Sequence, residues 1–128
     1  MPYALLALVL VILDQVVKYL VLTYIPLGGY VPFLPHIACL TYVQNTGAAF
    51  SMFSQHTWIL ALISLIMSVV LAVALWKNFF THPLGKVTLA LLLAGAVGNL
   101  IDRTLRGFVV DMFQLLFMNF AVFNVADI

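Results

Sequence analysis

The sequence predicts an all-α integral membrane protein, a single domain spanning residues 1–128 and built as a helical bundle. Hydrophobic residues make up 66% of the 128 positions and charged residues only 7%, whereas about 25% of residues are charged in soluble domains. The mean hydropathy is +1.21. Apolar stretches of the roughly 20 residues needed to cross a bilayer recur along the chain.

The first span is expected at about residues 2–25, before the helix-breaking run Pro26–Gly29. Its apolar run is longer than that of a cleavable signal sequence, no basic region precedes it and no small-residue cleavage site follows it, so we expect it to be retained. Asp14 and Lys18 stand four positions apart and share one helical face. They either neutralise each other within the span or orient polar groups at a site inside the bundle.

Residues 26–56 are expected to form a folded segment outside the hydrocarbon core. Three prolines prevent a long helix here, and residues 37–43 are β-prone, which favours short strands. Asn45 and Gly47 indicate a tight turn. This turn is either structural or brings backbone close to a site.

Two further spans are expected at about residues 57–76 and 87–103. The first of these has no charge and a tryptophan at each end, as interfacial anchors would be placed. The loop between the spans contains two of the five basic residues, Lys77 and Lys86. The positive-inside rule therefore places this loop in the cytoplasm and residues 26–56 on the opposite side of the membrane.

The third span has a polar face. Gly95, Asn99, Asp102 and Arg103 follow one another at offsets of 0, 4, 7 and 8, which places them on one side of a helix. Such a face either packs helices closely or contributes to a site. With the predicted topology, these residues, the Asp14–Lys18 pair and the residues after Arg103 all lie near the outer leaflet.

The last quarter of the chain places Asp111 and Asp127 in apolar sequence. An Asp at the centre of a membrane helix is unfavourable by about 2.5–3.5 kcal/mol, so two such residues require a function. Other chemistries lack their residues: no serine has a GxSxG context, Cys39 is the single cysteine, and the three histidines have no ligand spacing. We therefore expect no metal and no cofactor, and the net charge of +1 argues against nucleic acid as a partner.

Two neighbouring carboxylates permit peptide hydrolysis. In a low-dielectric site one of them keeps a proton while the other is ionised. The ionised group can take a proton from water, and its neighbour can donate to the carbonyl oxygen and then to the leaving amine. Asn124 precedes Asp127 by three positions and could hold that carboxylate or cap a helix.

Five motifs follow one another along the chain: Asp14-Gln-x-x-Lys18, Asn45-Thr-Gly-Ala-Ala-Phe50, Gly95-x-x-x-Asn99-x-x-Asp102-Arg103, Val109-Val-Asp111 and Phe120-Ala-Val-Phe-Asn-Val-Ala-Asp127. From about residue 10 to its end, the sequence resembles the bacterial lipoprotein signal peptidases (signal peptidase II). Asp111 and Asp127 match the catalytic dyad of that family. Its supporting positions are matched by Asp14, Lys18, Asn45, Gly47, Gly95, Asn99, Arg103, Asn124 and Ala126.

The resemblance implies a multi-pass aspartyl endopeptidase of the bacterial inner membrane. The usual inhibitor of the family is globomycin. It would remove signal peptides from diacylglyceryl-modified prolipoproteins by cutting before the lipidated cysteine, at the extracytoplasmic leaflet. Membrane lipid and globomycin-type cyclic peptides are its expected partners, and we expect a monomer. The family fold is four spans with a small extracytoplasmic β-like cradle. Here three complete spans are expected, with the start of a fourth near residues 120–128.

Since the sequence stops one residue after Asp127, this chain alone is expected to be weakly active or inactive, because a displacement of about 1 Å can lower a rate on the order of 100-fold. Two other functions stay open. A small ion or proton transporter with an aspartate relay would also use acids within the membrane. A non-catalytic assembly subunit would tolerate replacement of both aspartates by asparagine.

Overall fold

The structure, a computed structural model, describes residues 2–48 and 52–128. The helices are α1 (Pro2–Tyr24), α2 (Thr57–Trp76) and α3 (Pro83–Leu105), and the strands are β1 (Val31–Leu34), β2 (Ala38–Asn45) and β3 (Val109–Leu115). One turn of 3-10 helix, η2 (Val125–Asp127), follows. By length and composition, all three α-helices can cross a membrane, so the protein is a multi-pass membrane protein.

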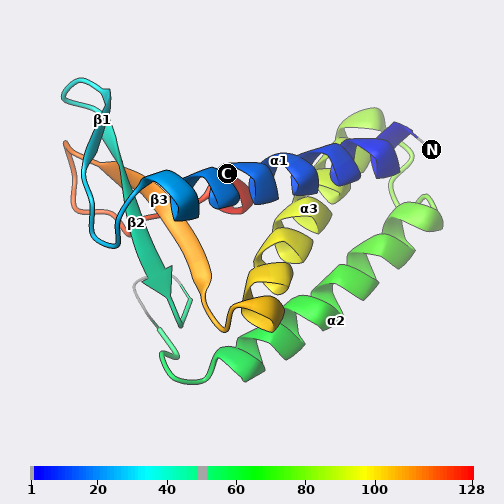
Figure 1. Cartoon of the computed structure of the whole chain (residues 1–128). Coiled ribbons are helices and arrows are strands. Elements are labelled where there is room, and N and C mark those ends of the chain that lie inside the picture. The colour runs from blue at the N-terminus through cyan, green and yellow to red at the C-terminus, as the bar shows by residue number, and fades with distance from the viewer. Residues whose placement is uncertain (1, 49–51) are drawn as a thin grey trace.

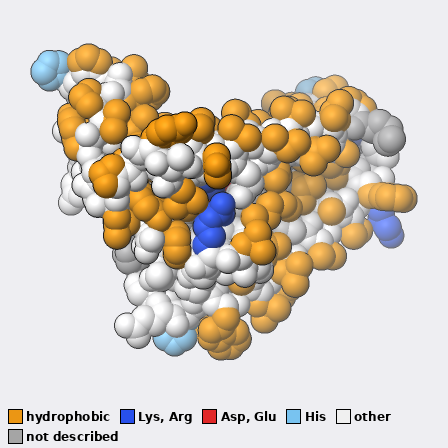
Figure 2. Space-filling model, in the orientation of Figure 1, with side chains coloured by type: hydrophobic (Ala, Val, Ile, Leu, Met, Phe, Trp, Pro, Cys, Tyr) orange, Lys and Arg blue, Asp and Glu red, His pale blue; other side chains and the backbone are white. Residues whose placement is uncertain are grey.

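The sheet lies at one end of the helices, where α1 ends and α2 begins, and the N-terminus lies beside the loop that joins α2 to α3 (Figure 1). Helix α3 packs against both α1 and α2. Apolar side chains cover most of the visible face, over helices and sheet alike (Figure 2). In α2, the buried residues are only Leu60, Ser68 and Leu71, so most of its apolar side chains face outward. An outward apolar surface of this kind suits contact with lipid.

Helix α3 begins at Pro83, four residues before the start predicted from hydropathy. Proline at the first helical turn has its φ angle already set for the helix and needs no intrahelical donor. His82 precedes it as the N-cap and accepts a hydrogen bond from the Leu84 amide at Nδ1, at 3.2 Å. The cytoplasmic loop expected at residues 77–86 is therefore shorter than its charge pattern suggests.

The sheet is antiparallel in the order β1-β2-β3. Its first two strands lie in the segment where the sequence predicts strands. The third strand, β3, follows α3 and was not predicted. It pairs with β2 so that Val43 lies opposite Asp111 and Asn45 opposite Val109.

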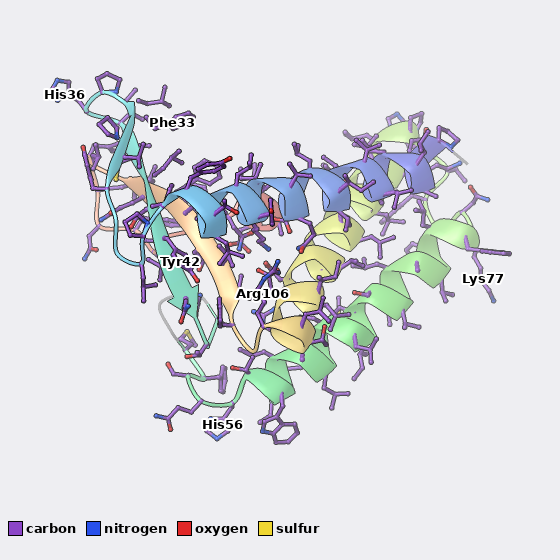
Figure 3. The ribbon with its side chains drawn as sticks, viewed as in Figure 1. Phe33, His36, Tyr42, His56, Lys77 and Arg106 are labelled. Carbon is purple, nitrogen blue, oxygen red and sulfur yellow. The ribbon has the colours of Figure 1, made fainter. Side chains whose placement is uncertain are left out.

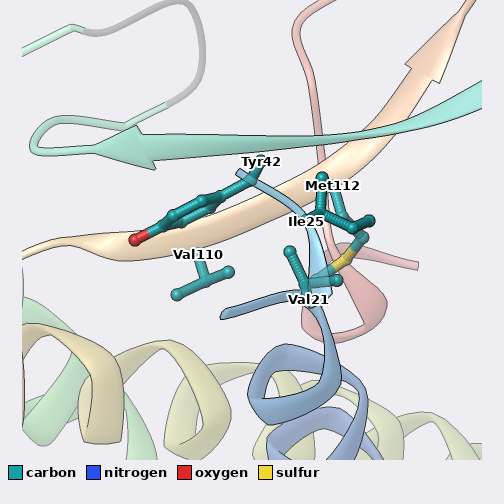
Figure 4. Close-up of a cluster of buried hydrophobic side chains, with 5 residues drawn as sticks. All are labelled: Val21, Ile25, Tyr42, Val110 and Met112. Atoms are coloured by element: carbon teal, nitrogen blue, oxygen red, sulfur yellow. The ribbon is translucent and has the colours of Figure 1, made fainter. Parts of the chain in front are cut away.

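A cluster of buried side chains joins the end of α1 to this sheet (Figure 4). Val21 from α1 and Ile25, just after its end, pack with Tyr42 from β2 and with Val110 and Met112 from β3. The last two are completely buried and stand on either side of Asp111 in the sequence. Packing on both sides therefore fixes the strand that carries Asp111 against the first helix.

The chain returns from β3 along the bundle. Phe123 forms an isolated bridge with Phe113, and η2 then contacts both α1 and α3. The start of a fourth span near residues 120–128 stays a prediction, because the described residues there form the bridge and a single 3-10 turn.

Candidate active site

Asp111 lies on β3 and is 2% exposed. The sheet register explains its first partner: Asn45 lies opposite Val109, two residues from Asp111, and side chains two apart on a strand point to the same face. Asn45 donates to Asp111 Oδ2 at 3.1 Å, and Asn124 donates to Asp111 Oδ1 at 2.6 Å. Two side-chain amides therefore hold this carboxyl group, one on each oxygen.

Asp127 lies in η2 and is exposed. Its Oδ1 accepts from Asn99 Nδ2 at 2.9 Å, and its Oδ2 accepts from the Asn124 backbone amide at 3.2 Å. Asn124 Oδ1 accepts in return from the Asp127 backbone amide at 3.2 Å, which completes a capping box. Asn124 thus does both things that its spacing suggested, since it caps the turn and binds a carboxylate.

Asn99 joins the two aspartates to the interior of the bundle. Its Oδ1 accepts from Asn124 Nδ2 at 3.2 Å and from Lys18 Nζ at 3.1 Å, while its Nδ2 serves Asp127. Because the oxygen has two donors and the nitrogen has an acceptor, the amide has one favourable orientation.

Behind Asn99 lies a buried ionic cluster. Lys18 is completely buried and pairs with Asp14 at 2.9 Å and with Asp102 at 3.2 Å. The other oxygen of Asp14 accepts from the Ala126 backbone amide at 3.0 Å. Asp14 and Lys18 therefore neutralise each other, as one interpretation of their spacing predicted, and Asp14 also binds the turn that carries Asp127.

Asp102 pairs with Arg106 as well as with Lys18, and its Oδ2 accepts from the Val110 amide at 2.9 Å. Arg106 lies near α1 and α3 in Figure 3. Gln15 donates to Asp102 at 3.2 Å and to the Gly98 carbonyl at 3.2 Å. The sequence analysis missed Gln15 and Arg106, although the four-residue spacing of Asp102 and Arg106 is that of a helical ion pair.

Arg103 points to a different part of the molecule from Asp102. It donates from Nη1 to Ser64 Oγ at 3.1 Å and from Nη2 to the Gly47 carbonyl at 3.5 Å. The Gly47 amide donates to Asn45 Oδ1 at 2.9 Å, so the turn predicted at Asn45 and Gly47 exists and also reaches the site. Positions 49 and 50 of that motif lie outside the described residues.

The close approach of η2 to α3 depends on Gly95. A Cβ atom on Gly95 would meet the carbonyl oxygen of Ala126. A side chain there would displace the turn that carries Asp127.

Both aspartates open into one cavity of about 570 Å³. Its polar lining residues are Asn45, Asn99, Arg103, Asp111 and Asp127. Its apolar lining residues are Ala48, Val109, Phe120, Ala121, Val122, Phe123 and Ile128. A second cavity of about 330 Å³ between α2 and α3 shares Asn99, Arg103 and Asp127 with the first. Gly95 and Ala126 line the second cavity, while Asp14 and Lys18 line neither.

The pKa of Asp111 is raised to about 6, chiefly by burial and also by the charge of Asp127, while the hydrogen bonds from Asn124 and Asn45 oppose the rise. A buried carboxyl with a raised pKa beside an exposed carboxyl group suits acid–base catalysis. Within residues 2–48 and 52–128, no three His, Cys, Asp or Glu side chains are grouped so that they could hold a metal ion.

Comparisons with known proteins point in one direction. A sequence model described as "Signal peptidase (SPase) II" matches residues 6–128. The lipoprotein signal peptidase of Streptococcus pneumoniae is 45% identical over 130 residues, covering 97% of this chain and 81% of the relative. That of Enterococcus faecalis is 46% identical over 125 residues, covering 98% and 78%. A solved bacterial membrane enzyme has a TM-score of 0.91 at 34% identity, covering 98% of this chain and 78% of its own.

Proposed function

Because the chain belongs to the signal peptidase II family, we propose that Asp111 and Asp127 are the catalytic pair with which it cleaves its substrate. The family resemblance noted in the sequence is confirmed, and the protein is an aspartic endopeptidase that removes signal peptides from prolipoproteins. One observation carries the assignment of the pair: Asn124 binds both carboxylates, one through its side-chain amide and the other through its backbone amide.

In the proposed mechanism the pair holds one proton between two unlike environments. Asp111 is the buried member and provides the acid, and exposed Asp127 provides the base. Asp127 takes a proton from a water molecule that attacks the scissile carbonyl, while Asp111 donates to the carbonyl oxygen. Proton transfer to the leaving amine then completes hydrolysis and restores the pair.

The amides hold this arrangement in place. Asn45 and Asn124 fix the two oxygens of Asp111, and Asn99 fixes Asp127. Asp14 and Lys18 act one layer behind, through the Ala126 amide and the Asn99 oxygen. The positions of the two carboxyl groups matter for the rate, since misplacement by about 1 Å can lower a rate on the order of 100-fold.

The substrate proposed for this site is the diacylglyceryl-modified prolipoprotein, cut before the lipidated cysteine. The apolar side chains of Phe120 and Phe123 on the wall of the larger cavity suit a lipid-modified peptide. The location proposed is the bacterial inner membrane, with the site at the extracytoplasmic leaflet. The sheet, whose strand β3 carries Asp111, lies at the end of the helices opposite the loop between α2 and α3 (Figure 1), which supports this proposal. A monomer, a lipid environment and the start of a fourth span near residues 120–128 complete the proposal.

The direct test is cleavage of a lipidated precursor peptide in phospholipid nanodiscs, by the chain itself and by a version extended through a fourth span, since low activity is expected of the chain alone. Asp111→Asn and Asp127→Asn should each abolish cleavage while the thermal transition persists. Lys77→Met, an exposed change at the other end of the molecule (Figure 3), is the matched control and should leave cleavage intact. Activity retained in either asparagine variant would exclude the pair and favour a non-catalytic subunit.

A further inference from the structure

We propose that Ser64, in the middle of α2, is a positioning residue that holds the Arg103 guanidinium against the catalytic cavity. The inference rests on the function proposed above and adds a residue to it. Ser64, like the other serines, lies in no GxSxG motif, and hydropathy shows α2 only as an apolar span. The structure assigns it a contact that neither observation predicts.

Helix α2 has three hydroxyl side chains, and each has a different partner. Thr57 donates to the Thr46 carbonyl at 2.7 Å, at the start of the helix. Ser68 donates to the Ser64 carbonyl at 2.7 Å, one turn earlier in the same helix. Ser64 Oγ accepts from Arg103 Nη1 at 3.1 Å, across 39 residues of chain, and so connects α2 to the polar face of α3.

The guanidinium of Arg103 has few other restraints. Its Nη2 reaches the Gly47 carbonyl at the long distance of 3.5 Å. Its Nε is buried and has no hydrogen-bond partner among the described residues. Ser64 therefore provides the shorter of the two hydrogen bonds that the structure records for this side chain.

Position matters for this cation because Arg103 lines both cavities together with Asn99 and Asp127. It also holds the Gly47 carbonyl, and the Gly47 amide binds Asn45, which in turn binds Asp111. Without the Ser64 hydroxyl, Nη1 loses its acceptor in an apolar region, and the planar group turns to find another. Both aspartates would then lose a fixed positive neighbour.

Removing the Ser64 hydroxyl should slow the chemical step rather than weaken substrate binding. Ser64 lines only the smaller cavity, so substrate affinity should change little when its hydroxyl is removed. Hydrogen bonds to charged groups are strong enough that we expect kcat to fall about tenfold or more in Ser64→Ala, with KM within about twofold. The acid limb of the kcat profile should move to higher pH, because a displaced cation stabilises the ionised carboxylate less.

The test compares kcat, KM and thermal midpoint for lipidated-precursor cleavage in nanodiscs. Ser64→Thr, which keeps the hydroxyl, should retain activity, and Ser64→Val, which has the same shape without it, should lose at least tenfold in kcat. Ser68→Ala removes the neighbouring hydroxyl of the same helix and should match the unmodified chain. The Thr and Val pair keeps the comparison valid should Ser64→Ala not fold.

Equal kcat in Ser64→Thr and Ser64→Val would overturn the inference, as would an equal loss in Ser68→Ala. Measuring Asp111→Asn alongside separates the two proposals. If that variant is inactive and Ser64→Val is fully active, only the role of Ser64 fails. If Asp111→Asn is active, the catalytic pair itself fails.

Discussion

The side-chain amide of Asn124 donates a 2.6 Å hydrogen bond to Oδ1 of Asp111, thirteen residues earlier in the chain. A donor at this distance stabilises the ionised carboxyl and so opposes the burial that raises its pKa to about 6. Asn45 lowers the pKa of Asp111 in the same way from the other oxygen. The charge of Asp127 acts in the opposite direction and, like burial, raises this pKa. The ionisation of Asp111 is thus set by groups that can be removed one at a time.

Removing the Asn45 amide should raise the pKa of Asp111 above about 6, because the ionised form loses a hydrogen bond. Removing the charge of Asp127 should lower it, because a negative neighbour is lost. Infrared titration of the carboxyl band in Asn45→Ala and Asp127→Asn would measure both shifts. Two shifts in the same direction would contradict this account of the site.

Asp111→Asn should gain stability relative to the unmodified chain as the pH rises toward neutral. Since the pKa of Asp111 is raised from 3.8 to about 6 on folding, its contribution to stability is full below pH 3.8 and is lost as the pH rises to about 6. The variant lacks this loss. Its advantage in thermal midpoint over the unmodified chain should therefore grow between pH 4 and 6 and stay constant above, and a constant difference across that range would refute the prediction.

Gly95→Ala should lower kcat on the order of 100-fold, because the new Cβ meets the Ala126 carbonyl and moves the turn that carries Asp127. Gly85→Ala is the control within the same helix. Its Cβ would meet the Phe80 side chain at the far end of α3, so it should affect stability and leave kcat unchanged. Similar kcat values for the two variants would show that η2 tolerates displacement.

Lys18→Met should destabilise the protein by about 3–5 kcal/mol, the usual effect of removing one partner from a buried ion pair. Asp14 would lose its cation at 2.9 Å, and Arg106 would be the one ion-pair partner left to Asp102 among the described residues. Chemical unfolding in detergent, compared with the exposed change Lys77→Met, measures the difference. A loss no larger than that of the control would mean that water or lipid replaces the ammonium group.

A globomycin-type cyclic peptide should raise the thermal midpoint if it occupies the cavity between the aspartates. A ligand at 100 times its Kd stabilises the native state by about 2.7 kcal/mol. The rise should be smaller in Asp127→Asn, which alters the cavity wall without filling it. An unchanged midpoint at saturating peptide would exclude this site as the binding place.

The helices were predictable because each is a long apolar run whose boundaries are marked by proline, glycine or charge. The grouping of polar residues was also predictable, since Gly95 and Asn99 share a helix face and the topology places Asp14 and Lys18 at a similar depth. The structure brings Lys18 to Asn99 through a hydrogen bond across 81 residues, and Asp14 pairs with Lys18. Depth in the membrane and helical spacing therefore predicted most of this polar group.

Strand β3 was missed because its partner lies far away in sequence. Residues 109–115 pair with residues 38–45, and no local pattern reveals a pairing across that distance. Ser64 was missed for a related reason. One hydroxyl in an apolar helix has no period or motif, and its meaning comes only from the arginine that packs against it. Asp102 and Arg103 are adjacent in the sequence and share the predicted polar face, but the cations that pair with Asp102 are Arg106 and Lys18.

The buried ionic cluster also bears on how the protein is made. Asp14 and Lys18 are four residues apart in α1, and Asp102 and Arg106 are four apart in α3, so each helix carries its own counter-ion. Helix α1 leaves the ribosome first and can enter the bilayer already balanced, with no need to wait for α3. When α3 follows, Asp102 meets Lys18, and the two ion pairs become one cluster. Loss of a single member would leave an unbalanced charge during synthesis and reduce the amount of chain that reaches the membrane at all.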